Sequence, residues 1–317
     1  MIMKIYDYFK RVFYQSKYEY SWQVAYRRRN INDNVLIDNT PFQLIPNTEQ
    51  YWLADPFVYE KDEKVYFFYE LFDIGRDKGS IAYSILNNGV ISKPKIIVEE
   101  PYHLSFPCIF EYDGDLFMIP ETGKTHNIYV YKCKEFPDVW VKDKLLLGGI
   151  DPSDTIWFEI NNMFYIITSL LNNGNPRDTT NYLYEFNMNN GKLQKPFKIL
   201  NTGKYGVRNA GNIFFKNNMF IRPGQIGEKT YGEGIVFWKC NLVNGKYEEE
   251  ELGTLHPKDI MLLNENKLSY IGLHTYNVSK HYEIIDLKQR RTNNILKRIQ
   301  IIFYMIYKRL KLFLINK

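Results

Sequence analysis

Apolar and polar positions along the chain follow a pattern that recurs about every 50 residues. Residues 51–70 show it first: an apolar strand, a polar turn at residues 61–64 and a second strand rich in aromatics predict a tight β-hairpin. Later segments repeat the apolar strand, the central polar turn and the second apolar strand, namely residues 105–121, 153–169, 209–225 and 258–274. The chain therefore contains five predicted hairpins at nearly regular spacing.

Five hairpins at this spacing predict a five-bladed β-propeller, because propeller blades repeat at roughly 40–50 residues. Segments between the hairpins supply outer strands, but after the fifth hairpin only residues 281–287 read as a clear strand. We expect residues 34–45, upstream of Tyr51, to complete the last blade and close the ring, which removes free sheet edges. The alternative is a β-sandwich or stacked sheets in which the likeness of the hairpins is accidental.

The two ends of the chain have a different pattern. Residues 290–317 place apolar side chains at helical spacing among basic ones, for example Ile299 next to Arg298. This predicts a basic amphipathic helix on an anionic membrane surface, with packing on the propeller or on a partner chain as the alternative. Residues 1–33 form a basic and aromatic segment with a weaker version of the pattern. The predicted fold is therefore all-β, a five-bladed β-propeller over residues 34–289 with a C-terminal amphipathic α-helix.

Composition narrows the function. Aromatic residues make up 16% of the chain, with 26 Tyr and 21 Phe, which favours strands and sugar-stacking surfaces. The net charge of +5 lies partly at the two ends, so the middle gives no sign of nucleic-acid binding. Three cysteines do not suggest a disulfide framework and fit a reducing compartment. The N-terminal residues lack the apolar core of a signal peptide, and no stretch reaches the length of a spanning helix, so we expect a cytoplasmic protein.

The ends of the five hairpins carry the candidate chemistry. In a propeller these ends would surround the central axis on one face. The first-strand position holds Asp55, Phe106, Asp154, Ala210 and Asp259, and the second-strand end holds Glu70, Glu121, Ser169, Gln225 and His274. Hairpin interiors stay apolar while the ends diversify, as expected for a site built on a repeated scaffold. The sequence therefore predicts a central pocket with three or more carboxylates, although surface polarity and hydrogen bonds between blades remain the alternative for each residue.

Clustered carboxylates perform a limited set of tasks. Two can cleave or form a glycosidic bond, and a group of them can hold Ca²⁺ or Mg²⁺. The catalytic candidates are Asp55, Glu121 and Asp154, and the substrate-binding candidates are Glu70, His103, Arg208, Asn209, Arg222, Gln225, Tyr231 and His274. Arg208 and His274 would hold a donor phosphate. No Cys or His pair has zinc-ligand spacing, so no metal residue is assigned and a divalent cation stays open.

The motifs "WLADPFVYE", "HLSFPCIFEYDGDLFMIPET", "RNAGNIFF" and "GLHTY" resemble one family over about residues 50–276. It is the propeller domain at the N-terminus of plant glucosamine inositolphosphorylceramide transferase, with stand-alone bacterial relatives in surface-polysaccharide loci. The family looks like a cousin of the five-bladed arabinanase-like glycosidases. The resemblance implies that Asp55 is the base and that Asp154 tunes its pKa. The acid Glu of those enzymes has no match, because Arg208 and Gln225 occupy that blade, so Glu121, one blade earlier, would have to substitute.

Three functions follow from these residues and from the resemblance. The first is a glycosyltransferase of cell-surface polysaccharide assembly, at the inner face of the plasma membrane, with an activated sugar donor and a glycan or lipid-linked acceptor. An activated leaving group needs less acid assistance, which suits the missing Glu. The second is a glycoside hydrolase with Asp55 as base and Glu121 as acid. The third is a glycan-binding propeller without catalysis.

Overall fold

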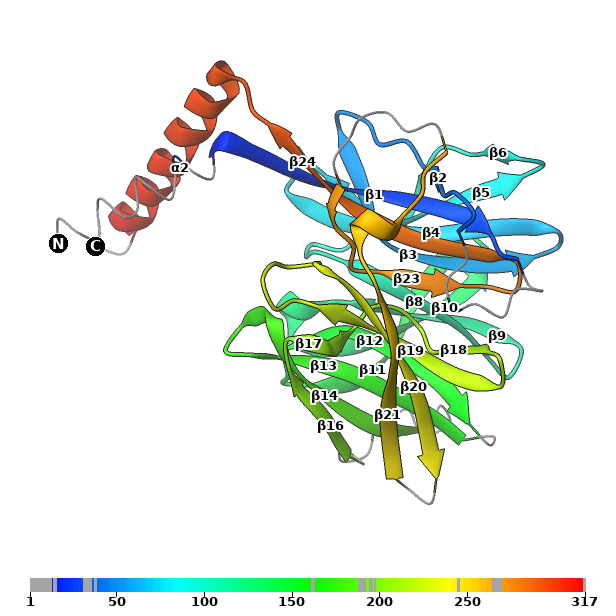
Figure 1. Ribbon diagram of the computed structural model, residues 1–317. Coiled ribbons are helices and arrows are strands. Elements are labelled where there is room, and N and C mark those ends of the chain that lie inside the picture. The colour runs from blue at the N-terminus through cyan, green and yellow to red at the C-terminus, as the bar shows by residue number, and fades with distance from the viewer. Residues whose placement is uncertain are drawn as a thin grey trace.

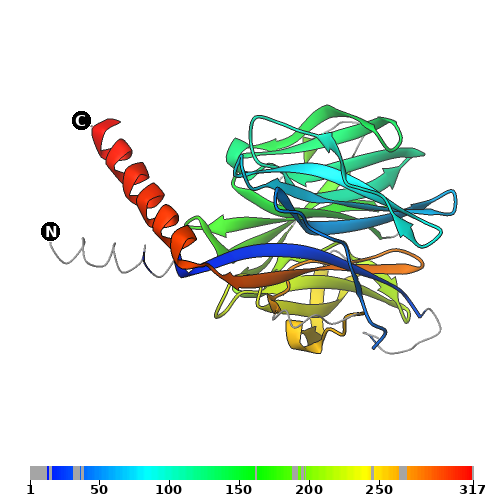
Figure 2. The ribbon, with the colours of Figure 1, turned by 90° about the horizontal axis from the view of Figure 1, so that it is seen from above.

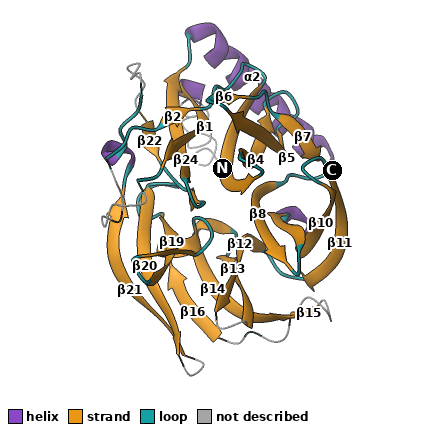
Figure 3. Ribbon diagram, turned by 90° about the vertical axis from the view of Figure 1, so that its right-hand side faces the viewer, coloured by secondary structure: helices purple, strands orange, loops and turns teal. Residues whose placement is uncertain are grey.

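Five antiparallel sheets form the body of the computed structural model and surround a common centre (Figures 1 and 3). The structure describes residue 13, residues 16–30, residue 36, and residues 39–160, 163–187, 192–193, 196, 198–243, 246–263 and 270–315. This arrangement confirms the predicted five-bladed β-propeller and excludes the β-sandwich.

The blades are numbered in chain order, and their strands are given from the centre outward. Blade 1 comprises β3 (Tyr51–Lys61), β4 (Lys64–Asp73), β5 (Lys78–Asn87), β6 (Val90–Ile91) and β7 (Lys95–Val98). Blade 2 comprises β8 (Ser105–Tyr112), β9 (Asp115–Glu121), β10 (Asn127–Glu135) and β11 (Val139–Gly148), with a 3₁₀ turn η1 (Gly123–Thr125).

Blades 3 and 4 repeat this plan. Blade 3 comprises β12 (Pro152–Ile160), β13 (Met163–Asn172), β14 (Asn175–Asn187), β15 (Lys192–Leu193) and β16 (Lys198–Gly203). Blade 4 comprises β17 (Tyr205–Asn209), β18 (Phe214–Lys216), β19 (Met219–Ile226), β20 (Gly234–Val243) and β21 (Lys246–Leu255). The 3₁₀ turn η2 (Pro257–Asp259) follows.

Blade 5 joins the two ends of the chain. It comprises β22 (Tyr270–Gly272), β23 (Tyr276–Val278), β24 (Tyr282–Thr292), β1 (Tyr18–Arg28) and β2 (Gln43–Leu44). β1 pairs with β24 along its whole length, from Tyr18 opposite Thr292 to Arg28 opposite Tyr282. The ring is thus closed by a segment upstream of Tyr51, as expected.

The prediction of which segment closes the ring was wrong in detail. Residues 18–28 supply the long strand, and of the expected residues 34–45 only β2 pairs, at the outer edge of β1. Several of the expected residues, 34, 35, 37 and 38, lie outside the described residues. The propeller therefore includes part of the segment 1–33 and extends to Thr292, because β24 needs a long partner to satisfy its backbone groups.

The fifth hairpin was also predicted in the wrong place. Residues 257–259 form η2 instead of a strand, and Asp259 accepts a hydrogen bond from the backbone N–H of His256. The inner hairpin of blade 5 is formed by β23 and β24. Asp259 therefore leaves the ring of candidate residues. Residues 264–269 of the predicted hairpin lie outside the described residues.

The inner strands of blades 1 to 3 share one backbone feature. Asp55, Phe106 and Asp154 have positive φ values of 50°, 46° and 45°, and each lies where the pairing with the second strand shifts register. A bulky residue such as Phe106 rarely adopts this conformation, so the surrounding structure must impose it. Such β-bulges bend the strand and re-aim its side chains. The equivalence of the three positions, inferred from the hairpin alignment, is confirmed by the backbone.

Helix α2 (Ile295–Ile315) follows β24 and projects away from the sheets (Figures 1 and 2). Among its described side chains, Leu296 is 74% and Phe303 is 69% exposed, while Lys297 pairs with Glu19 at 2.6 Å. The predicted helix is confirmed, and Ile295, Leu296, Ile299 and Phe303 are among its exposed apolar side chains. None of the helices within the described residues is both long and apolar enough to span a bilayer.

Candidate functional site

Buried ionisable side chains gather at the ends of the inner strands. Five of these side chains are at most 8% exposed: Asp55, Glu70, Asp154, Arg208 and His274. They come from blades 1, 3 and 4 and from the loop before β23 of blade 5. The bulges at Asp55 and Asp154 turn both carboxylates toward this cluster. We call Asp55, Glu70, Glu121, Asp154 and Asp286 the acid ring. The predicted convergence of carboxylates is present.

One half of the acid ring is organised around His274. Nδ1 of His274 lies 2.7 Å from Oδ2 of Asp286, and Nε2 lies 3.6 Å from Oδ1 of Asp55. Burial acts to lower the pKa of His274, but Asp286 and Asp55 outweigh it and raise the pKa. Burial raises the pKa of Asp55 to about 6, a shift that His274 opposes. The hydroxyl of Thr275 donates to Oδ1 of Asp55 at 3.0 Å and favours the ionised carboxylate.

The His274 half could in principle hold a cation, because Asp55, His274 and Asp286 each bring a ligand atom within 4.8 Å of the others. Asp286, however, already accepts backbone N–H groups from Asp55 at 3.0 Å, His274 at 3.1 Å and Thr275 at 3.0 Å. Its fourth contact is Nδ1 of His274. The lone pairs a metal would need are therefore in use, and the donor set does not fit a divalent cation.

The other half of the acid ring is organised around Arg208. Its Nε donates to Asp154. Its Nη2 lies 3.2 Å from Oδ1 of Asp154 and 3.4 Å from Oε2 of Glu121. Its Nη1 donates to the carbonyl of Pro176 at 3.1 Å. Burial alone would raise the pKa of Glu121, but Arg208 and the hydroxyl of Ser153 bring it below its usual value. Burial acts to raise the pKa of Asp154, whereas Arg208, which contacts both of its oxygens, opposes this shift and favours the ionised carboxylate.

Glu70 stands apart from both halves. It is 4% exposed, and its Oε1 makes no hydrogen bond within the described residues. Nε2 of His103 lies 3.3 Å from that oxygen, and the backbone N–H of Gly79 donates to Nδ1 at 3.0 Å. Because Nδ1 accepts, the ring is neutral with its proton on Nε2, in agreement with the lowered pKa that burial gives His103. Burial and then Asp55 raise the pKa of Glu70 well above its usual value.

The acids at the second-strand ends also join neighbouring blades. Glu121 of blade 2 accepts the backbone N–H of Asp154 in blade 3 at 3.0 Å, and Asp286 of blade 5 accepts that of Asp55 in blade 1 at 3.0 Å. The hydroxyl oxygen of Ser169 in blade 3 likewise accepts the backbone N–H of Asn209 in blade 4 at 3.2 Å. Among the described residues, Glu70 accepts no such bond. The side chain at this position of the second strand therefore joins adjacent blades in blades 2, 3 and 5, but it does not do so in blade 1.

Aromatic side chains line the approach to the His274 half. Trp22 of β1 stacks on His274 with ring centroids 3.7 Å apart, and Tyr231 meets His274 edge-on at 5.4 Å. Nζ of Lys288 lies 5.6 Å from the ring of Trp22 and 5.7 Å from that of Tyr231. The guanidinium of Arg208 lies 5.5 Å from Tyr231, so this ring contacts both halves. Tyr231 therefore lies beside the acid ring, and its binding role stays a prediction.

The remaining candidates support the acid ring or lie away from it. Gln225 donates to Oδ2 of Asp154 at 2.7 Å, and Asn209 donates to the backbone carbonyl of Asp154 at 2.8 Å. Arg222 is fully buried and binds Glu249 through Nε at 2.5 Å. It touches the acid ring only indirectly, through Oδ1 of Asn209 at 3.2 Å. Arg222 is therefore part of blade 4 and not of the central pocket.

Sequence reasoning missed four residues of this site: Asp286, Thr275, Trp22 and Lys288. Asp286 lies in "HYEIIDL", which the misplaced fifth hairpin excluded from the alignment. Pairing that segment with "TYNV" would have brought both Asp286 and Thr275 into the ring. Trp22 and Lys288 are opposite each other in the β1–β24 pair, a contact between the two ends of the chain that no local pattern reveals.

The fold resembles the propellers of several solved carbohydrate-cleaving enzymes. The catalytic domain of the GH62 α-L-arabinofuranosidase from Coprinopsis cinerea superposes with a TM-score of 0.56 at 10% identity, covering 86% of this chain and 98% of that domain. An α-L-arabinofuranosidase from Lactobacillus brevis gives a TM-score of 0.52 at 14% identity, covering 72% of this chain and 79% of that one. At such low identity these likenesses show the fold alone.

The family itself is shown by the sequence comparison. The family described as glucosamine inositolphosphorylceramide transferase 1, N-terminal, matches residues 43–280, and the chain belongs to this family. The glucosamine inositolphosphorylceramide transferase 1 of Arabidopsis thaliana is 27% identical over 254 residues, which cover 74% of this chain and 31% of the relative. That of Oryza sativa subsp. japonica is 27% identical over 210 residues, covering 62% of this chain and 27% of the relative. The chain thus spans less than a third of these relatives.

Proposed function

We propose that the chain is a carbohydrate enzyme that transfers a glycosyl group to a hydroxyl acceptor at the acid ring. The observation that carries the proposal is a pair of buried carboxyl groups, Asp55 and Glu70, that lie in different surroundings. Oδ1 of Asp55 accepts the hydroxyl of Thr275, whereas Oε1 of Glu70 makes no hydrogen bond within the described residues. Burial raises the pKa of Glu70 well above its usual value and that of Asp55 to about 6. Titratable groups with separated pKa values are the usual arrangement for acid and base catalysis.

Each carboxyl group has one step in this proposal. Asp55 accepts the proton of the acceptor hydroxyl as that oxygen bonds to the anomeric carbon. The bond from the anomeric carbon to the leaving oxygen breaks, and Glu70 gives its proton to that oxygen. Exchange with water then restores both groups. His274 and Thr275 hold Asp55 in place, and His103 lies beside Glu70.

This proposal moves the acid from Glu121 to Glu70. Glu121 has a lowered pKa and binds Ser153, the backbone of Asp154 and Arg208, so it is ionised and has no proton to give. The proposed role of Glu121 and Asp154 is to stabilise positive charge at the anomeric centre. Arg208 and His274 already bind carboxylates through most of their N–H groups, which argues against the donor-phosphate role expected from the sequence.

Hydrolysis is the second candidate, with water as the acceptor. It is favoured by Glu70, because a carboxyl group with a raised pKa suits the acid that the resemblance to arabinanase-like enzymes left unassigned. Transfer and hydrolysis differ only in whether an acceptor hydroxyl or water reaches Asp55. A groove beside the site therefore bears on the choice, and the ring of Phe72, which lines such a groove, lies 6.0 Å from that of His103.

A groove of about 730 Å³ runs along the rim of blades 1 and 5 to the root of α2. Its lining includes Trp52 and Phe72, whose rings stack 4.3 Å apart, with Tyr20, Arg291 and Lys297 on the other side. Along β24 the six steps from Asp286 to Thr292 span roughly 20 Å, and α2 follows three residues later, so α2 begins on the same side of the propeller as the acid ring. Such an aromatic-lined groove suits an acceptor glycan.

Our proposal keeps the setting expected from the sequence. α2 would attach the protein to an anionic membrane surface on the cytoplasmic side, and a lipid-linked glycan would enter along the groove. The exposed apolar side chains of α2 support this orientation. The donor would be an activated sugar, and the pathway would build a bacterial surface polysaccharide.

The test is a product assay with wild type, Asp55→Asn and Glu70→Gln. Nucleotide sugars and aryl glycosides serve as donors, with oligosaccharides as acceptors, and products are identified by mass spectrometry. We expect wild type to elongate an acceptor and both variants to lose at least about 100-fold in rate. Release of free sugar without elongation would show hydrolysis, and full activity in both variants would remove these residues from the mechanism.

A further inference from the structure

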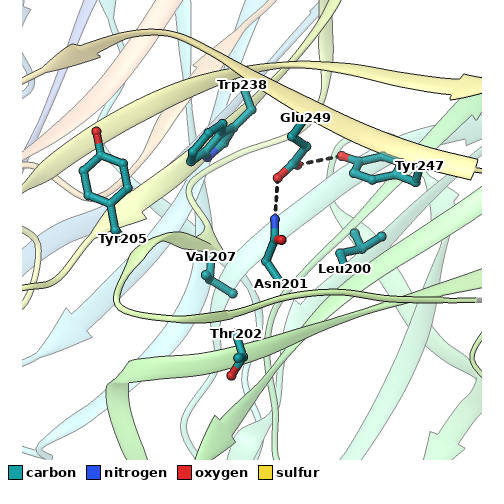
Figure 4. A pocket seen from close by; sticks show the side chains of 8 residues that line it. All are labelled: Leu200, Asn201, Thr202, Tyr205, Val207, Trp238, Tyr247 and Glu249. Carbon is teal, nitrogen blue, oxygen red and sulfur yellow. Dashed lines mark hydrogen bonds between the residues drawn. The ribbon is translucent and has the colours of Figure 1, made fainter.

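A second cavity lies on the side of the propeller, between the outer strand β16 of blade 3 and blade 4. Its volume is about 320 Å³, at the lower end of the range for small-molecule sites. It is lined by Leu200, Asn201, Thr202, Tyr205, Val207, Trp238, Tyr247 and Glu249 (Figure 4). None of these residues belongs to the acid ring.

The aromatic walls of this side cavity are held rigidly. The rings of Tyr205 and Trp238 stand nearly perpendicular, at 89° with centroids 6.1 Å apart. Nε1 of Trp238 donates to the carbonyl of Gly206 at 3.1 Å, and the hydroxyl of Tyr205 donates to Glu251 at 2.9 Å. Gly206 has a φ of 67°, and a Cβ there would lie 2.5 Å from Nε1 of Trp238. The glycine therefore allows the indole to lie against β17.

The charge inside the side cavity is balanced. Glu249 accepts hydrogen bonds from Nε of Arg222 at 2.5 Å, from its terminal nitrogen at 3.0 Å, from the hydroxyl of Tyr247 at 2.8 Å and from Nδ2 of Asn201 at 2.9 Å. Figure 4 shows the last two of these bonds. Arg222 is wholly buried beneath the carboxylate. The cavity thus offers neither a free anion to a cation nor a free cation to a phosphate.

We propose that the side cavity binds one neutral, hydroxyl-rich sugar residue of a glycan, independently of the acid ring. Aromatic faces beside fixed hydrogen-bonding groups suit a sugar ring, which has apolar C–H faces and a hydroxyl edge. The exposed amide of Asn201 and hydroxyl of Thr202 lie at the open edge, while buried Tyr247 closes the other end. In Figure 4, Tyr205 and Trp238 lie on the side of the cavity opposite Tyr247, with Asn201 between the two sides.

The position of the side cavity separates it from catalysis. β17 carries Tyr205 in the cavity and, three residues later, Arg208 in the acid ring. The two sites therefore lie on opposite parts of one short strand. A glycan held at Tyr205 would remain bound while another part of it, or another molecule, occupied the acid ring.

The test is a binding measurement on the full chain carrying Asp55→Asn and Glu70→Gln, which disables the acid ring and leaves the side cavity intact. A printed array of neutral and anionic glycans serves as the probe, and the affinity of each neutral hit is then measured by isothermal titration calorimetry. We expect neutral glycans to bind this background and Tyr205→Ala to weaken them at least tenfold. Phe215→Ala is the matched control, since Phe215 is 57% exposed on β18 of the same blade and outside the cavity.

Two results would overturn the proposal. One is the absence of any neutral glycan from the array in the Asp55→Asn and Glu70→Gln background. The other is equal affinity with Tyr205 and with Tyr205→Ala. If Tyr205→Ala does not fold, as judged by circular dichroism, Asn201→Ala at the exposed edge gives the same comparison. Because the readout is binding without turnover, it stays informative even if the proposed transferase activity is wrong.

Discussion

The two halves of the acid ring balance their carboxylates with different cations. Around Asp154 and Glu121 the cation is Arg208, which stays charged at every accessible pH. Around Asp55 and Asp286 the cation is His274, which carries charge only below its pKa. The Arg208 half is therefore a permanent support that spans blades 2, 3 and 4. The His274 half is the part whose protonation can change during a reaction.

Replacing Arg208 tests the Arg208 half of the acid ring and has the largest expected effect on stability. Arg208→Met leaves two buried carboxylates without their cation, so the free energy of unfolding falls by about 3–5 kcal/mol. Urea denaturation at pH 7 measures this loss. Arg177→Ala is the control, because the guanidinium of this half-buried arginine donates to the backbone carbonyls of Glu228 and Lys229 and not to a buried carboxylate, so its loss stays within about 0.5 kcal/mol. Equal effects of the two substitutions would contradict the supporting role of Arg208.

Replacing Asp55 tests the His274 half of the acid ring, whose protonation can change. Asp55→Asn keeps the size of the side chain and removes the base, so the turnover rate falls by about 10²–10⁴-fold while stability changes little. In wild type the rate rises with pH through about 6, as Asp55 loses its proton, and falls at higher pH as Glu70 loses its own. A pH–rate profile of kcat/KM checks both limbs. A flat profile would exclude this pair of groups.

Replacing His274 separates charge from packing. Because Asp286 and Asp55 raise the pKa of His274, its stabilising contribution is fully present below the unfolded-state pKa of about 6.5. That contribution is lost as the pH rises through the higher folded-state pKa. The cost of His274→Gln, about 1–3 kcal/mol at pH 6, should therefore decrease toward pH 9. Equal costs of His274→Gln at pH 6 and at pH 9 in this denaturation series would contradict the charge-dependent role of His274.

Replacing Thr275 has the smallest expected effect. Thr275→Val removes the hydroxyl that donates to Asp55, so the acid limb of the pH–rate profile moves up by about one pH unit, or about 1.4 kcal/mol. Thr275→Ser keeps the hydroxyl and should keep the wild-type profile. Identical profiles for the valine and serine variants would show that the hydroxyl does not act on Asp55.

The sequence predicted the scaffold better than it predicted the chemistry. Hairpins 1 to 3 align without gaps, because each is a local unit, and the shared backbone of Asp55, Phe106 and Asp154 follows from that alignment. The fifth hairpin was misplaced onto residues 258–274, whereas β23 and β24 form it, and the strand that pairs with β24 on its outer side, β1, comes from the other end of the chain, which local patterns do not report. Asp286 was lost with it.

The roles of Glu70 and Glu121 also could not be predicted from the sequence. Both close the second strand of a hairpin, and the sequence gives no reason to treat them differently. The structure separates them through residues of other blades: Arg208 and Ser153 hold Glu121 ionised, while Glu70 meets only neutral His103. Protonation depends on these long-range contacts. A single sequence indicates which residues gather, but not which of them carries a proton.

The closing pair of β1 and β24 has a consequence for the newly made chain. Arg27 and Glu283, which form a buried ion pair across these strands, are 256 residues apart in the sequence. At synthesis rates of about 5–20 residues per second, β1 waits about 10–50 s before β24 emerges. During that time an apolar strand has no partner, which is the condition under which strands join other chains. Slow translation or crowded expression should therefore affect the yield of this protein more than its final stability would suggest.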